Sequence, residues 1–346
     1  IRMVSRISKA AEGVRSNFSG YAGDIINSAM FRFEKGPDDK IFLKSLALRE
    51  RSDSVMAENV ANSNFPAIVE AFEIKAQSPD KTDNLIEIGD FLLSDSEYLF
   101  FPKRYKKSLE IGSLQKDKSY ISSIRTFPIN TEFKVVHTYA RQMGSPTITY
   151  ELNASFVLLP EVPMTPRYAD DRVGYFTVTY TDFDRNPQKV ERTSMITRWR
   201  LEPKPEDVEK YKNGELVEPA KPIVFYIDPA TPKEWVPYLI QGVNDWQAAF
   251  EKAGFKNAIY ALEAPTFEED STWSLEDARH SAIVYKPSSI ANASGPHVND
   301  PRSGEIIESH INWYHNVMSL LNKWYFVQCS PSDTGARKVV FDSELM

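Results

Sequence analysis

The chain has 346 residues, of which 42% are hydrophobic and 26% are charged, as in an ordinary globular protein. This length exceeds what one hydrophobic core usually spans, so the sequence predicts two domains. The formal net charge of −7 argues against a nucleic-acid partner and against broad attraction to an anionic membrane. No apolar run reaches the roughly 20 residues of a transmembrane helix, so no transmembrane segment is expected.

Most of the first 160 or so residues are predicted to form strands. The turn Gly36 to Asp39 separates two apolar segments and predicts a β-hairpin. A short helix is expected near Ala67 to Lys75. Further on, TEFKVVHTYA and TITYELNASFVLLP alternate apolar and polar residues, which is typical of half-buried strands. His137 lies in the first of these and is expected to be a structural strand residue.

A change of pattern follows Pro160, Pro163 and Pro166. VGYFTVTY and RTSMITRWRLE then predict another strand pair. The segment Pro203 to Pro222 is charged and rich in proline, so we expect a solvated connector there, at the main domain boundary.

From Ile223 the pattern is strand, helix, strand. IVFYID predicts a strand buried on both faces. Thr231, Pro232 and Glu234 have the spacing of a capping box, which predicts a helix start. Pro237 would instead distort the first turn or move the start later.

This helix carries one apolar stripe, and Gly254 is expected to end it in a left-handed conformation. NAIYALE and HSAIVYK predict two more strands, joined to the first through a right-handed crossover. The stripe consists of Trp235, Leu239, Val243, Trp246 and Phe250.

A second hairpin is predicted in GPHVNDPRSGEIIESHINWYHNV, because Asp300 to Gly304 suits a type I turn that ends in a left-handed glycine. Its strands would be Ala291 to Val298 and Glu305 to Trp313. YHNVMSLLNKWYFVQ predicts a helix that is apolar nearly all round, hence largely buried. FDSELM has the pattern of a helix start, with Asp342 or Ser343 as its cap.

The single cysteine, Cys329, excludes an internal disulfide and any zinc site built from cysteines. It lies in the apolar, aromatic segment WYFVQC, which favours a buried and unreactive thiol.

Self-contained catalytic machinery is hard to find. The sequence has neither a glycine-rich phosphate loop nor a G-x-S-x-G elbow. His310 and His315 are five residues apart, which disfavours a shared metal on either a helix or a strand. Glu276 and His280 are four apart, but their segment is predicted to be a loop. His297 lies on the predicted edge strand, facing either solvent or a ligand.

An exposed edge strand would bind an extended peptide by adding it to the sheet. Alternatively, the first domain would cover the edge, as proteins often arrange. A third hypothesis, a sugar-binding first domain, depends on scattered aromatic residues that are more often found in a core or interface. These residues are Tyr21, Phe100, Phe101 and Tyr105.

The stretch from about Val173 to Met346 resembles the first part of the catalytic region of large secreted bacterial zinc-dependent metalloproteases of the metzincin type. The matching segments are RVGYFTVTYTDF, ITRWRLEPKPED, LVEPAKPIVFYIDPATP, GVNDWQAAFEKAGFKNAI, EDARHSAIVYK, GPHVNDPRSGEII and ARKVVFDSELM. The first 160 or so residues resemble the β-rich domain that precedes this region in such proteins, through VSRISKAAEG, FSGYAGD, RFEKGPDDKIFL and PINTEFKV.

The resemblance implies an α+β and α/β mixture. A β-rich N-terminal domain of unknown role would span residues 1–165. A strand pair and charged connector would span 166–221, and a metzincin-like (zincin) sheet subdomain would span 222–346. The antiparallel edge strand would form the rim on which an extended peptide or protein substrate lies. The implied rim residues are Ala293, Ser294, Gly295, Pro296, His297 and Val298.

The same resemblance implies secretion or a periplasmic location, and zinc as cofactor of the full-length protein. The zinc motif H-E-x-x-H-x-x-G-x-x-H is absent here and would be expected a short distance past Met346. We therefore assign no catalytic residue and no metal ligand to this chain, and expect it to bind no zinc alone. The first hypothesis is a zinc-dependent metalloendopeptidase whose present portion is inactive by itself. The alternative is a non-catalytic peptide- or partner-binding protein on a metzincin-like scaffold.

Overall fold

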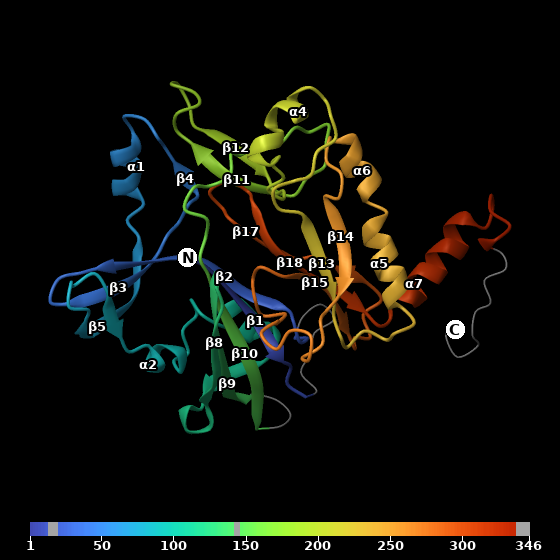
Figure 1. The fold of residues 1–346 in the computed structure, drawn as a ribbon. Coiled ribbons are helices and arrows are strands. Elements are labelled where there is room, and N and C mark those ends of the chain that lie inside the picture. Colours follow the sequence, from blue (N-terminus) through green and yellow to red (C-terminus); the bar gives the residue numbers. More distant parts are fainter. Residues whose placement is uncertain (13–19, 142–145, 337–346) are drawn as a thin grey trace. The chain divides into compact units, whose positions relative to one another are not determined.

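The computed structural model describes residues 1–12, 20–141 and 146–336 (Figure 1). Its contacts divide the chain into two compact units. Unit 1 contains Ile1–Arg200, Glu276–Arg279 and Val298–Ile307. Unit 2 contains Leu201–Leu275, His280–His297 and Glu308 onward. The predicted region 166–221 is therefore divided: its strand pair lies in unit 1, and its charged connector, from Leu201 on, lies in unit 2. The described part is β-rich, with a smaller share of helix.

Unit 1 is built on a large antiparallel sheet with the strand order β6-β5-β3-β2-β1-β10-β9-β7, in which β8 also pairs with β9. Its strands are β1 (Arg2–Lys9), β2 (Ile25–Lys35), β3 (Lys40–Ser45), β5 (Ala67–Gln77), β6 (Asn84–Ile86), β7 (Ile111–Leu114), β8 (Tyr120–Thr126), β9 (Asn130–Arg141) and β10 (Thr147–Val157).

The predicted hairpin at Gly36 to Asp39 is confirmed, since β2 and β3 pair on either side of it. Gly36 N–H donates to the carbonyl of Lys40 at 2.8 Å, which closes the turn. Asp38 and Asp39 have φ of 57° and 50°, a left-handed conformation that aspartate tolerates better than most residues.

The helix predicted near Ala67 to Lys75 is wrong. This segment is strand β5, which pairs with β3 on one side and β6 on the other. Its apolar residues, such as Phe72 opposite Ile41, fit either a strand or a helix by spacing alone. Pairing with two neighbouring strands decides between them.

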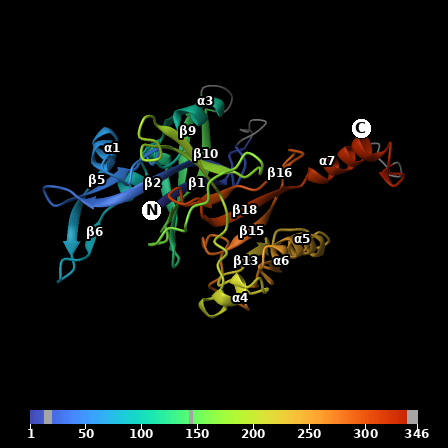
Figure 2. The same cartoon turned by 90° about the horizontal axis from the view of Figure 1, so that it is seen from above.

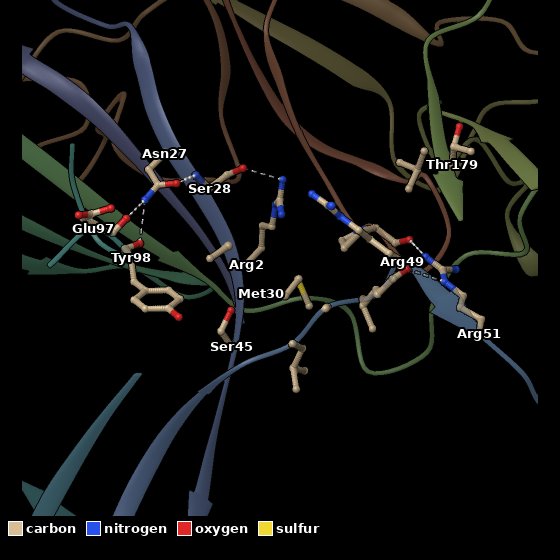
Figure 3. Close-up of a pocket in the computed structure, with 16 residues that line it drawn as sticks. Arg2, Asn27, Ser28, Met30, Ser45, Arg49, Arg51, Glu97, Tyr98 and Thr179 are labelled. Atoms are coloured by element: carbon tan, nitrogen blue, oxygen red, sulfur yellow. Dashed lines mark hydrogen bonds between the residues drawn. The ribbon is translucent and has the colours of Figure 1, made fainter. Parts of the chain in front are cut away.

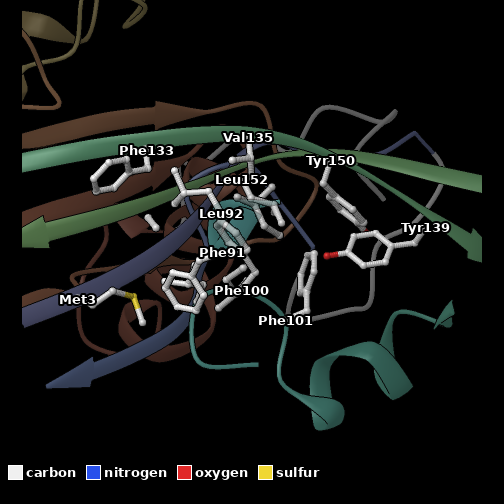
Figure 4. Close-up of a cluster of buried hydrophobic side chains, with 14 of the residues drawn as sticks. Met3, Phe91, Leu92, Phe100, Phe101, Phe133, Val135, Tyr139, Tyr150 and Leu152 are labelled. Atoms are coloured by element: carbon white, nitrogen blue, oxygen red, sulfur yellow. The ribbon is translucent and has the colours of Figure 1, made fainter. Parts of the chain in front are cut away.

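The core of unit 1 lies against β9 and β10, whose paired register brings apolar side chains onto one face (Figure 4). Val135, Tyr139, Tyr150 and Leu152 are fully buried there. Phe100 and Phe101 pack into the same core and are each 1% exposed. Two of the four aromatic residues behind the sugar-binding hypothesis are thus core residues, not a surface platform.

His137 is a fully buried strand residue in this core, as predicted. Its Nε2 lies 3.2 Å from the carbonyl of Leu92, and its Nδ1 lies 3.1 Å from the hydroxyl of Tyr139. Both contacts are satisfied when Nε2–H donates to Leu92 and the Tyr139 hydroxyl donates to Nδ1. Burial lowers the pKa of His137 from its ordinary value to about 4, so the ring is neutral at pH 7.

Short elements complete unit 1. A three-stranded sheet has the order β12-β11-β4, and its β11–β12 pair confirms the predicted strand pair. The elements are β4 (Glu50–Arg51), β11 (Thr177–Asp182), β12 (Glu191–Ile196), α1 (Ala57–Ser63), α2 (Gly89–Leu92), α3 (Lys103–Ser108) and the 3₁₀ turn at Lys116–Lys118.

The sheet of unit 2 has the order β14-β13-β15-β18-β16, with β17 also paired to β18. Strands β14, β13, β15 and β18 run parallel, whereas β16 is antiparallel to β18. The strands are β13 (Ile223–Ile227), β14 (Ile259–Glu263), β15 (Ser281–Lys286), β16 (Ala293–Ser294), β17 (His297–Asn299) and β18 (Ile306–Tyr314).

Helices α5 and α6 connect β13 to β14 and pack on this sheet (Figures 1 and 2). The helical elements of the region are the 3₁₀ turn Pro205–Asp207, α4 (Val208–Lys212), α5 (Val236–Asn244), α6 (Gln247–Lys252), α7 (Val317–Trp324) and the π-helix Tyr325–Cys329.

The capping box at Thr231 is wrong, whereas the later start expected from Pro237 is correct. Helix α5 is preceded by Trp235 and has Pro237 in its first turn. Thr231 instead closes a turn, because its N–H donates to the carbonyl of Asp228 at 2.9 Å. Gly254 has φ of 95°, the predicted left-handed conformation.

The apolar stripe is broken at Trp246, which is 63% exposed. The helix is interrupted between α5 and α6, so the regular angular spacing of the stripe is lost there.

The helix predicted as largely buried is mostly exposed. Trp324 and Val327 are 56% and 70% exposed, and Val317 is the buried residue of α7. Cys329 is half-buried instead of buried. The segment FDSELM, with the predicted caps Asp342 and Ser343, lies outside the described residues.

Candidate functional site

The predicted hairpin turn at Asp300 to Gly304 is present and firmly held. Asp300 N–H donates to the carbonyl of Glu305, and Gly304 N–H donates to the carbonyl of Asp300, both at 2.8 Å. Gly304 has φ of 78°, as a left-handed glycine bulge requires.

Side chains hold this turn as well. The fully buried Asp300 carboxylate accepts from Arg302 Nη2 at 2.7 Å and from Arg302 Nε at 3.0 Å. Arg302 Nη2 also donates to the carbonyl of Pro160 at 2.6 Å. The turn is therefore anchored within unit 1 by a charge-assisted network.

The predicted rim forms two short strands in place of one continuous strand. Ala293 and Ser294 of β16 lie opposite Trp313 and Asn312 of β18, and β17 pairs with the same strand. Gly295 and Pro296 separate the two strands. The break has a local cause, because proline has no N–H to donate to a ladder.

Polar groups at the break are engaged within the sheet. The Pro296 carbonyl accepts from the Ser309 hydroxyl at 3.0 Å, and Ser294 Oγ accepts from Asn312 Nδ2 at 3.2 Å. Ser294 and Gly295 are exposed, whereas Val298 is 1% exposed. Ser294 and Gly295 are therefore the open part of the predicted rim, and Val298 is its buried end.

The histidines of the hairpin have separate surroundings. His310 Nε2 lies 3.3 Å from the carbonyl of His280 and 3.9 Å from the Glu308 carboxylate. His315 Nδ1 is instead hydrogen-bonded to the Tyr285 hydroxyl. Burial lowers the pKa of His297, which favours its neutral ring.

The Glu276 and His280 pair is divided between the two units. Glu276 forms ion pairs with Arg125 and Lys134 in unit 1. The ring of His280 stacks on Trp273 at 5.5 Å between centroids, in unit 2. Across residues 1–12, 20–141 and 146–336, no group of three histidine, cysteine or acidic side chains is arranged to hold a metal.

Sequence reasoning missed a cavity in unit 2, which we name the apolar groove. It encloses about 630 Å³ between α5, α7 and the sheet. Ile283 and Ile311 are register partners on β15 and β18 and form part of its floor. Tyr238 and Leu321 at its borders are 68% and 44% exposed. The remaining lining residues are Trp235, Leu239, Gly242, Val243, Trp313 and Met318.

The apolar groove is unusual because its lining is almost wholly apolar, yet it is open. Large apolar surface exposed to water is costly and generally marks a place where another apolar surface binds. The spacing of Trp235, Leu239 and Val243 predicted an apolar face on the helix, but gave no sign that this face lines an open groove.

Comparison with known proteins gives little functional information. No curated protein and no solved structure matches the chain. None of the helices in the described ranges is long and apolar enough to cross a membrane. One family matches, described as a domain of unknown function (DUF5117), over residues 23–204. That range is more than half of the chain and coincides largely with the continuous part of unit 1. The chain therefore belongs to the DUF5117 family.

Proposed function

We propose that the chain is part of a zinc-dependent metalloendopeptidase, secreted or periplasmic, that hydrolyses peptide bonds through a zinc-bound water. The observation that carries the proposal is the sheet of unit 2. A parallel sheet with one antiparallel edge segment, β16, is the arrangement implied by the resemblance to metzincins. Ser294 and Gly295 are exposed, and β16 ends the strand order of the sheet, where an extended peptide could add as a further strand.

The apolar groove supports the same proposal. An amphipathic helix needs an apolar surface to cover its own apolar face. The groove offers this surface on the sheet, between α5 and α7. We propose that a helix of the longer gene product, carrying the motif H-E-x-x-H, occupies it.

The residues described here do not themselves form a zinc site, so no catalytic step is assigned to them. In the full-length enzyme zinc would supply a Lewis acid and a nucleophilic water. The contribution of this chain would be to hold the substrate backbone extended along the rim and so restrict its orientation.

The test is to compare the 346-residue chain with the longer gene product. We expect the longer product to bind one zinc per chain and to cleave an unfolded protein substrate in a chelator-sensitive manner. We expect the 346-residue chain to do neither. A longer product without zinc and without activity would remove the proposal in favour of the alternative, a non-catalytic peptide-binding protein.

The rim itself is tested with Gly295→Phe in the longer product. A Cβ on Gly295 meets only the Ile311 side chain at 3.9 Å, so the fold accommodates it. The large ring would occupy the peptide path, and we expect kcat/KM to fall by roughly tenfold or more. Gly174→Phe is the matched control, because Gly174 is exposed and has nothing within 4 Å of an added Cβ. Equal kcat/KM values for the two variants would show that the rim does not bind substrate.

A further inference from the structure

A second cavity lies in unit 1 and contains an excess of arginine. We name it the arginine cavity. It encloses about 510 Å³, within the size range of small-molecule sites. Arg2, Arg49 and Arg51 line it from β1, from the loop before β4 and from β4 (Figure 3). Glu97 is the acidic residue of the lining.

Arg51 is held in place by structural contacts. Its Nη2 donates to the carbonyl of Pro301 at 2.6 Å, and its Nε donates to the carbonyl of Leu48 at 3.2 Å. Its guanidinium lies over the Tyr180 ring, 4.1 Å from the centroid. Arg51 thus contributes a fixed positive charge to the wall of the cavity, while its donors are largely occupied.

Arg2 and Arg49 have side-chain N–H donors that no acceptor among the described residues occupies. Arg2 Nη2 donates to Ser28 Oγ at 3.3 Å, but Arg2 Nε is buried and has no hydrogen-bond partner in the described chain. Arg49 is exposed, and its guanidinium forms no ion pair or hydrogen bond with the residues that the structure describes. Figure 3 shows these two side chains extending toward the same part of the cavity.

The neighbouring carboxylates leave the charges of Arg2 and Arg49 unpaired within the described chain. Asp300 is close enough to Arg2 to raise its pKa, but burial dominates and lowers it overall. The Asp300 carboxylate already accepts both side-chain hydrogen bonds of Arg302. Glu97 is exposed and lies 3.7 Å from Lys103 Nζ. Asp53 and Asp182 oppose the charge of Arg51, but no carboxylate among the described residues forms an ion pair with Arg2 or Arg49. The buried Arg2 Nε, which has no acceptor, adds an energetic cost that a bound anion would relieve.

We propose that the arginine cavity binds a small organic anion, with its carboxylate or phosphate group held by Arg2 and Arg49. The guanidinium fork matches the oxygens of either group. Met30, Leu46 and Val178 also line the cavity and would contact the apolar part of the ligand. Most of the lining, Arg49 included, lies in the DUF5117 region, whereas Arg2 precedes that region. The proposal is independent of any peptidase activity.

The experiment is calorimetric titration of the 346-residue chain at low salt. The probes are hexanoate, hexyl phosphate and inorganic phosphate, with hexanol as the uncharged control. We expect hexanoate or hexyl phosphate to bind and hexanol not to bind. Whichever of the two binds more tightly identifies the preferred head group. Inorganic phosphate shows whether a phosphate group binds without an apolar chain. Affinity should weaken as salt increases, because the attraction is electrostatic.

Variants locate the site. Arg49→Ala should weaken binding by roughly tenfold or more, since it removes a charged donor pair from the head group. It should leave folding intact, because this exposed side chain pairs with none of the residues that the structure describes. Arg104→Ala is the matched control, an exposed arginine outside the cavity. Arg2→Gln retains a donor for Ser28 and removes the charge, and it should also weaken binding. The proposal is overturned if no anion binds, or if the Arg49 and Arg104 variants bind equally well.

Discussion

At the scale of single residues, His137 couples stability to pH. Its folded-state pKa of about 4 lies below the ordinary value of 6.5, mainly through burial. Between these values the unfolded chain binds the extra proton, so unfolding becomes easier as pH falls. The stabilisation is complete above about pH 6.5 and is lost progressively toward pH 4. From pH 7 to pH 5 we expect a loss of roughly 1–2 kcal/mol from this ring.

Denaturant titrations at several pH values measure this loss through the difference between the native chain and His137→Gln. Glutamine can donate to Leu92 and accept from Tyr139, but it does not titrate. The variant should therefore show a shallower fall in stability. Taking this difference cancels opposite effects such as that of Glu132, whose pKa is raised by burial. The exposed His315→Gln is the control, and equal slopes for both variants would contradict the assignment.

Gly304 and Gly214 allow two costs of an added side chain to be measured separately: the strain of a positive φ and the collision with a neighbouring atom. Both have positive φ, at 78° and 82°. A Cβ on Gly304 would collide with the backbone carbonyl of Ile196, whereas one on Gly214 has nothing within 4 Å. We expect Gly214→Ala to cost about 1 kcal/mol, and Gly304→Ala to cost about 2 kcal/mol or more. Urea unfolding measures both values. Equal losses would mean that the Ile196 contact relaxes without cost.

At the scale of elements, the apolar groove should bind an apolar dye. We expect the 346-residue chain to enhance the fluorescence of ANS, and Leu321→Glu to reduce the enhancement several-fold by placing a charge at the groove border. Val327→Glu is the control, since Val327 is more exposed and lies outside the groove lining. If the two variants behave alike, the dye binds elsewhere.

A longer gene product should be more stable than the 346-residue chain, on the proposed function, because its zinc helix would bury the apolar groove. It should also bind less ANS. Melting temperatures of the two proteins provide the comparison, and identical values would show that nothing packs in the groove.

The sequence predicts an element well where its apolar spacing agrees with the strand or surface that it packs against. The alternation around His137 and the turn at Asp300 to Gly304 lead to correct strands and a correct hairpin. The segment at Ala67 fails because its apolar spacing fits a helix, while pairing with β3 and β6 makes it a strand. The prediction of a buried helix around Trp324 fails for another reason, since an apolar sequence does not show whether another part of the protein covers that helix.

The two candidate sites also differ in how far they could be predicted from the sequence. The hairpin that carries the proposed rim could be predicted, because it follows directly from a local turn. The arginine cavity could not, because Arg2 and Arg49 are distant in sequence and meet only through sheet order and register. The only local signal was the pair Arg49 and Arg51, two residues apart, and such pairs are common on solvated surfaces.

At the scale of the whole molecule, unit 1 is not continuous in the sequence. Two of its segments, Glu276–Arg279 and Val298–Ile307, come after the first segment of unit 2. Ala278 N–H donates to Asn130 Oδ1 at 3.0 Å. Arg200 holds Glu305 through two hydrogen bonds, at 2.9 and 2.6 Å. We therefore expect a chain cut at an engineered protease site at Gly214, an exposed position after α4, to remain a single species.

Size-exclusion chromatography before and after cleavage tests this expectation. The two pieces should elute together in native buffer and separate in denaturant. Separation in native buffer would show that the returning segments Glu276–Arg279 and Val298–Ile307 contribute little to unit 1.

This interlaced path also bears on how such a protein changes during evolution. The matched family region ends at residue 204, yet the fold around it is completed by Glu276–Arg279 and Val298–Ile307. A recombination event that carried only residues 23–204 into another gene would leave those segments behind. The region is therefore expected to be inherited together with the sequence that follows it, and duplications or shufflings of it alone should be rare among genomes.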